Sequence, residues 1–240
     1  MWNPPDNPVP AEILHEGVRD TREGRFAEGL QKFLWFHTNA LEFENALYGV
    51  RLSFALSYWL ELAGNYPPAR EAFIKVRDET EQAFRNDPSH AALFHDLASM
   101  NSYLREGRRT ADLFETIARS HPTAAEDVFR YAEEDLIAHD RFSTCNPFLK
   151  GAADIEELGE TYQAQRQFEE SRPEQDPPIP RFARQEFVSR SATHVALLVI
   201  NGRIEEARSA RVRALTIVDD PEFQWMLDFA MAGHLPEQSH

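Results

Sequence analysis

The chain has 240 residues, of which 42% are apolar and 11% aromatic, and this composition excludes an intrinsically disordered protein. Its formal net charge of −15 argues against a nucleic-acid-binding surface, because that affinity comes mainly from lysine and arginine side chains that neutralise phosphates. The same charge argues against docking on anionic membranes, and it gives a preference for a basic protein or peptide as the partner.

Sorting and redox signals are sparse in the sequence. Cys145 is the single cysteine, so the chain can form no intramolecular disulfide. The first six residues carry neither a basic region nor an apolar run, which is unlike a signal peptide. The longest uncharged apolar run, residues 195–200, is far too short to span a bilayer. We therefore expect a cytoplasmic protein.

Apolar residues recur at helical spacing along most of the chain, and they predict about 11 or 12 helices. Residues 1–9 are rich in proline and are expected to form an extended arm. The expected helices cover residues 11–21, 26–42, 46–63, 67–84, 89–105, 110–119, 124–138, 153–171, 182–200, 203–217 and 221–232. Pro147 predicts an irregular hairpin between the seventh and eighth of them.

The predicted domain organisation follows from one proline-rich stretch. Residues 172–180 contain four prolines and are expected to form an extended linker. Residues 10–171 before it form helical hairpins, and residues 181–240 after it form a last hairpin with a capping helix. We expect the two parts to make one continuous solenoid.

A short pattern of turn, aromatic and small residues occurs twice near the amino terminus. It consists of a glycine, an aromatic residue at +2, a small residue at +5, an aromatic at +9 and an apolar residue at +12. The two copies are Gly24, Phe26, Gly29, Phe33, Phe36 and Gly64, Tyr66, Ala69, Phe73, Val76. Gly202 begins a fair third copy and Asp140 a weak one. At Gly107 only the glycine matches, although a one-residue shift brings Ala111 and Ala118 into the contact positions.

The pattern resembles the tetratricopeptide repeat (TPR) family, in which Gly-x-aromatic-x-x-Ala starts the second helix of each hairpin. The resemblance implies an all-α fold, built as a right-handed superhelix of stacked antiparallel helix pairs. It also implies a non-catalytic scaffold that binds a protein or peptide along the face made by the first helices. Counting back from the turns, the matching places hold Leu14, Val18, Phe54, Tyr58, Leu97, Asn101, Ala192 and Ala196. These residues predict no carboxylate clamp of the family's lysine and asparagine type.

Five residues are candidates for a peptide-binding groove, because tyrosine and arginine are frequent binding anchors. They are Tyr48, Arg51, Tyr58, Asn101 and Arg105. In this interpretation Arg51 lies beside the apolar stripe of its helix and reaches the groove. In the alternative interpretation, both tyrosines pack inside the repeats and Arg51 is paired with an acid.

Signals for catalysis or metal binding are weak, although the chain has nine histidines. Glu12 and His15 have di-iron spacing, but such a site needs a second Glu-x-x-His and two further glutamates. Asp135 and His139 lie one turn apart, which is half of a metal site at most, and Cys145 sits at a packing position. We expect no enzymatic activity, no metal and no cofactor. A helical metalloprotein or enzyme whose site is not visible in the sequence is the alternative, and a homo-oligomer stays open.

Overall fold

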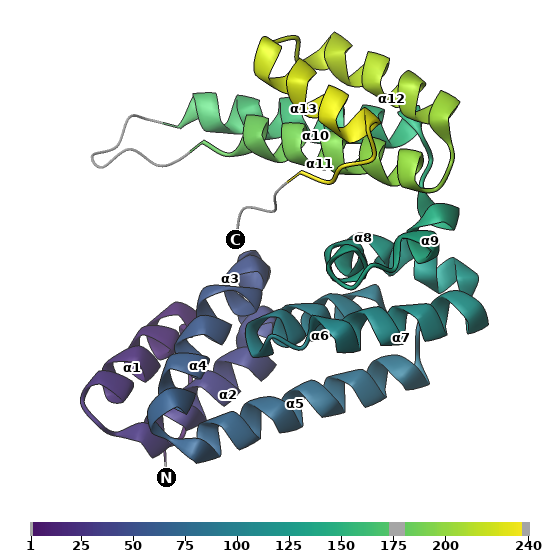
Figure 1. Cartoon of the computed structure of the whole chain (residues 1–240). Helices are drawn as coiled ribbons and strands as arrows, with labels where there is room; N and C mark the ends of the chain where they lie inside the picture. Colours follow the sequence, from purple (N-terminus) through teal and green to yellow (C-terminus); the bar gives the residue numbers. More distant parts are fainter. Residues whose placement is uncertain (1, 173–180, 237–240) are drawn as a thin grey trace. The chain divides into compact units, whose positions relative to one another are not determined.

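The computed structural model describes residues 2–172 and 181–236, and these residues form an all-α protein without any strand (Figure 1). The prediction of an all-α fold is therefore confirmed. Residues 2–9 form no helix, and residues 173–180 of the predicted linker lie outside the described residues. The helices are α1 (Pro10–Arg22), α2 (Phe26–Phe43), α3 (Tyr48–Leu52), α4 (Phe54–Asn65), α5 (Pro67–Asn86), α6 (Ala91–Leu104), α7 (Gly107–Ser120), α8 (Pro122–Ala138), α9 (Phe142–Cys145), α10 (Ala152–Ser171), α11 (Ala183–Ile200), α12 (Ile204–Ile217) and α13 (Pro221–Met231), with 3-10 helices at Asn45–Leu47 and Asn146–Phe148.

One predicted helix, residues 46–63, is divided in the structure. A 3-10 turn precedes α3, and α3 is separated from α4 at Ser53, where φ is −124° and ψ is −93°. The hydroxyl of Ser53 donates a hydrogen bond to the carbonyl of Gly49, over 2.7 Å. Serine side chains that bond to nearby backbone groups compete with regular helix geometry. The prediction of a single straight helix was therefore wrong at this position.

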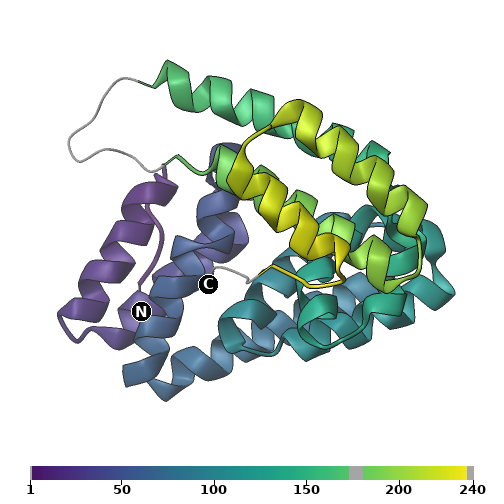
Figure 2. The same cartoon turned by 45° about the horizontal axis from the view of Figure 1, so that its top comes forward.

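The chain divides into two compact units, Met1–His139 and Asp140–His240. In the first unit α1 packs on α2, α4 on α5, and α7 on α8. Three further contacts join successive hairpins: α2 with α4, α4 with α6, and α6 with α8 (Figure 2). In the second unit α11 is the central helix and contacts α9, α10, α12 and α13. Both helices next to the predicted linker, α10 and α11, belong to this second unit.

Large side chains fill the core of the first unit. Trp59 is 1% exposed, and its indole Nε1 donates a hydrogen bond to the carbonyl of Ala69 over 2.9 Å. Its ring meets Phe73 edge to face, with the centroids 5.2 Å apart. Phe36 and Phe73 are both fully buried. Aromatic side chains bury the largest apolar area per residue, so the Trp59 contacts hold α4 against α5. Phe36 of α2 belongs to the same buried cluster, which joins the two amino-terminal hairpins.

Three hairpin turns share one backbone geometry. A residue with left-handed φ ends the first helix: Gly24 at 78°, Arg105 at 58° and Gly202 at 77°. The amide of the next residue then bonds to the carbonyl five residues earlier, and all three of these bonds are 2.8 Å long. This is the Schellman arrangement, which satisfies carbonyl groups at a helix end. The predicted turn place Asp140 also has a left-handed φ, 58°.

The third turn residue is thus Arg105, and the prediction of Gly107 was wrong, because Gly107 begins α7. Counting from Arg105, the +5, +9 and +12 positions hold Thr110, Phe114 and Ile117, which are at most 3% exposed. The packing positions of the third hairpin therefore follow those of the first, with the turn two residues earlier than predicted, although Gly107 takes the place of the aromatic residue at +2.

The second turn differs in another way. Gly64 lies inside α4 and its φ is not left-handed, so it does not act as a turn glycine. The packing part of the pattern holds there, since Ala69 and Phe73 are fully buried. In the first hairpin, a side chain added at Gly29 would lie 3.2 Å from the carbonyl oxygen of Gly17. The prediction of a small residue where the two helices touch is therefore confirmed at Gly29.

Candidate functional site

The corrected turn changes which residues occupy the matching places on the first helices. Counting ten and six residues back from Arg105 gives His95 and Ser99, and the same count from Asp140 gives Arg130 and Glu134. The previously expected Leu97 and Asn101 are fully buried. We define the first-helix face as the six accessible residues Phe54, Tyr58, His95, Ser99, Arg130 and Glu134.

An aromatic row, which we define as Tyr48, His95 and Tyr131, crosses this face from α3 over α6 to α8. The Tyr48 hydroxyl lies 2.9 Å from His95 Nδ1. The His95 ring stacks on Tyr131 with centroids 4.0 Å apart and an interplanar angle of 13°. The Arg130 guanidinium lies over the Tyr131 ring, 4.5 Å from its centroid. All three rings are partly exposed, so they form a continuous polarisable surface over three helices.

A buried ion pair lies next to the aromatic row. Arg51 of α3 donates a hydrogen bond to the carboxylate of Asp96 of α6, and each residue is only 7% exposed. A second guanidinium nitrogen lies 3.2 Å from the ring of His37 on α2. The pair ties α3 to α6 directly beneath Tyr48 and His95, because the Arg51 guanidinium lies 5.9 Å from the Tyr48 ring centroid.

Burial shifts the pKa of four groups at or beside this pair, namely His37, Tyr48, His95 and Asp96. Loss of hydration raises the pKa of Asp96, although Arg51 opposes the shift. Burial lowers the pKa of His37 to about 3, and the nearby Arg51 charge acts in the same direction. Burial also lowers the pKa of His95 and raises that of Tyr48. At neutral pH the imidazoles of His37 and His95 are therefore uncharged.

The five predicted groove residues differ in burial. Arg51 is 7% exposed and paired with Asp96, as in the alternative interpretation. Asn101 is fully buried; its amide oxygen accepts from Arg77 over 2.8 Å, and its amide nitrogen donates to Thr110 over 3.1 Å. Arg105 is the exposed turn residue after α6. Of the five, Tyr48 and Tyr58 remain partly accessible on the side of the first helices.

His95, Arg130 and Tyr131 were missed by the sequence reasoning. Because the turn was placed at Gly107 instead of Arg105, the count back along α6 was displaced by two residues and ended on the buried residues Leu97 and Asn101. The available signal was the apolar spacing of α7, in which Thr110, Phe114 and Ile117 repeat the pattern that begins at Gly24.

The weak metal and nucleophile candidates have structural partners. His139 Nδ1 lies 2.9 Å from the carbonyl oxygen of Asp135, and Cys145 is fully buried. Within residues 2–172 and 181–236, no three His, Cys, Asp or Glu side chains gather closely enough to hold a metal ion. No helix in the described part of the chain combines the length and the apolar character needed to cross a membrane.

Comparison of the chain with protein-family models, with curated proteins and with solved structures found no match.

Proposed function

We propose that the protein is a cytoplasmic, non-catalytic scaffold whose first unit is a TPR-like right-handed stack of helical hairpins. In this proposal the first-helix face and the aromatic row bind a peptide or an extended segment of another protein. The observation that carries the proposal is the aromatic row, because partly exposed rings in contact across α3, α6 and α8 suit an extended ligand.

The chemistry of the face favours a particular kind of segment. Phe54 is 63% exposed and, with Tyr58 one turn later, offers an apolar anchor site on α4. Aromatic anchors of this type dominate many interfaces. Glu61 on α4 and Glu134 on α8 are exposed carboxylates, while the Arg130 guanidinium is engaged with Tyr131. A segment with an apolar centre and flanking lysine or arginine residues fits this arrangement, in agreement with the net charge of −15.

A peptide selection tests the proposal directly. Random displayed peptides are selected on the immobilised full chain, and the affinity of the enriched peptides is measured for three variants. We expect Phe54→Ala and Tyr131→Ala to weaken binding about tenfold or more, because truncated anchors typically cost at least that much. Phe168→Ala is the matched control, since Phe168 is 64% exposed but lies on α10 of the second unit.

Two results would contradict the proposal. Equal binding by all three variants would place the contact elsewhere, and failure of any peptide to enrich would remove the support for a peptide-binding face. Stoichiometric iron, zinc or manganese in the purified protein would instead favour a metalloprotein.

A further inference from the structure

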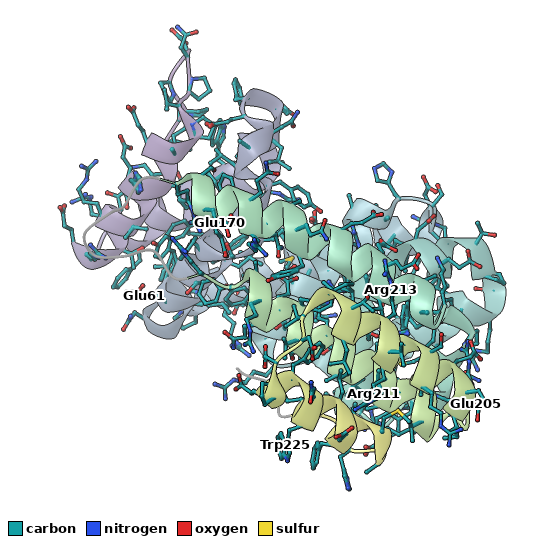
Figure 3. All side chains as sticks on the ribbon, turned by 90° about the horizontal axis from the view of Figure 1, so that it is seen from above. Glu61, Glu170, Glu205, Arg211, Arg213 and Trp225 are labelled. Atoms are coloured by element: carbon teal, nitrogen blue, oxygen red, sulfur yellow. The ribbon has the colours of Figure 1, made fainter. Side chains whose placement is uncertain are left out.

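Helix α13 and the segment that follows it carry an exposed aromatic patch, which we define as Trp225 and Phe229 of the helix and His234 after it. Trp225 is 66% exposed and Phe229 is 40% exposed. Their rings stack with centroids 5.6 Å apart, and Phe229 stacks in turn on His234 at 4.6 Å. Figure 3 shows the Trp225 side chain projecting away from the helix. The patch is therefore a preformed row of rings that is open to solvent.

The position of this patch is unusual for a capping helix. A terminal helix of an array needs a polar outer face if it is to end the array in water. The inner face of α13 is well packed, since Phe223, Leu227 and Ala230 are fully buried. Its outer face nevertheless presents a tryptophan and a phenylalanine one helical turn apart. Clustered exposed aromatic residues of this kind mark interaction sites.

The charges beside the patch narrow the choice of partner. Both carboxylates of α13 already have an arginine: Asp228 lies 2.7 Å from Arg211, and Glu222 lies 3.2 Å from Arg184. A purely basic partner would have to displace these arginines. A partner surface that carries both positive and negative side chains beside aromatic rings complements the patch better. The α13 patch on another copy of the chain is such a surface.

We propose that the α13 patch is the contact of a homodimer with two-fold symmetry. In such an interface the same patch faces itself, so Trp225 packs against the patch of the second copy. Arg211 then approaches Asp228 of the second copy, and the two-fold rotation brings Arg211 of the second copy to Asp228 of the first. The inference goes beyond the peptide-binding proposal, because the patch lies in the second unit. Specific interfaces usually bury about 800 Å² on each partner, and so short a helix favours a dissociation constant in the micromolar range.

Sedimentation equilibrium of the full chain tests the dimer. We expect reversible dimerisation, and Trp225→Ala should raise the dissociation constant about 30-fold or more, because each anchor is lost twice in a symmetric interface. Phe168→Ala, an equally exposed aromatic residue on α10, should leave the constant unchanged. A wild-type chain that stays monomeric at about 100 µM would overturn the proposal. So would equal effects of the two variants, and thermal melts verify that both variants are folded.

Charge reversal tests the symmetry of the contact. Arg211→Asp and Asp228→Arg should each weaken self-association, because each sets like charges opposite one another. An equimolar mixture of the two variants should associate more tightly than either variant alone, since opposite charges then meet at both contacts. In the mixture, the ion pair between positions 211 and 228 of the same chain stays broken in both variants. The tighter association can therefore only come from contacts between copies. A mixture that associates no better than the separate variants would overturn the symmetric pairing.

Discussion

His37 should make the stability of the first unit depend on pH. The residue lies on α2 and is 9% exposed, with the Trp59 ring edge-on at 5.9 Å and a guanidinium nitrogen of Arg51 at 3.2 Å. Its pKa falls from 6.5 to about 3 in the folded chain, because burial disfavours the imidazolium and Arg51 repels it. Unfolding returns the side chain to water, where it can take up a proton at mildly acidic pH.

The sign and size of the effect follow from proton linkage. A depressed histidine pKa gives stability that is fully present above pH 6.5 and is lost as the pH falls from 6.5 towards 3. At pH 5, the unfolded chain carries close to one proton at this position that the folded chain does not. At about 1.4 kcal/mol per pH unit below 6.5, the free energy of unfolding should fall by about 2 kcal/mol.

Urea unfolding at pH 7 and pH 5 measures this change. Tryptophan fluorescence is the probe, because Trp2, Trp35 and Trp59 all lie in the first unit. His37→Gln keeps a hydrogen-bond acceptor near Arg51 and should lose about 2 kcal/mol less than the wild type on acidification. His15→Gln, at an exposed histidine of α1, is the control and should behave as the wild type. The same pH dependence in His37→Gln and wild type would refute the assignment of this proton to His37.

Three further predictions concern stability and are measured by the same urea unfolding. Arg51→Ala should cost about 3–5 kcal/mol at pH 7, because it leaves Asp96 buried without its cation; the cost should shrink at low pH, since the raised pKa of Asp96 eases protonation, and wild-type stability would contradict the buried pair. Trp59→Ala should cost about 3–5 kcal/mol because its site is closed on every side, and a loss below about 1 kcal/mol would count against that packing. Gly24→Ala should destabilise by about 1–2 kcal/mol owing to its left-handed φ, whereas Gly64→Ala, inside α4 with open space around it, should stabilise by about 0.5–1 kcal/mol; effects of the same sign would refute the distinction between the two glycines.

Helix positions were predictable from the sequence because apolar spacing and proline placement both carry that information. The starts of α5, α8 and α13 are prolines at the first helical turn, where no amide is needed. The break at Ser53 was not predictable, because it depends on a side-chain bond to Gly49 that competes with a helix of continuous apolar spacing.

The candidate site was harder to predict because it depends on the identity of a turn residue. Glycine is the usual residue with left-handed φ, so Gly107 was the natural choice over Arg105. The left-handed φ of Arg105 and the hydrogen bond from the Glu106 amide to the Asn101 carbonyl identify the turn in the structure. The burial of Arg51 was equally hidden, because its partner Asp96 lies 45 positions away in the chain and on another helix.

The Schellman turn at Arg105 has a consequence for how such a chain can change over evolutionary time. Its shape is maintained by a backbone hydrogen bond, and the left-handed residue can be arginine at a modest conformational cost. A hairpin can therefore exchange its glycine for another residue and keep its fold, while its neighbour keeps the glycine and changes elsewhere. The spacing between buried residues in such an array would therefore be retained after the residue identities had diverged.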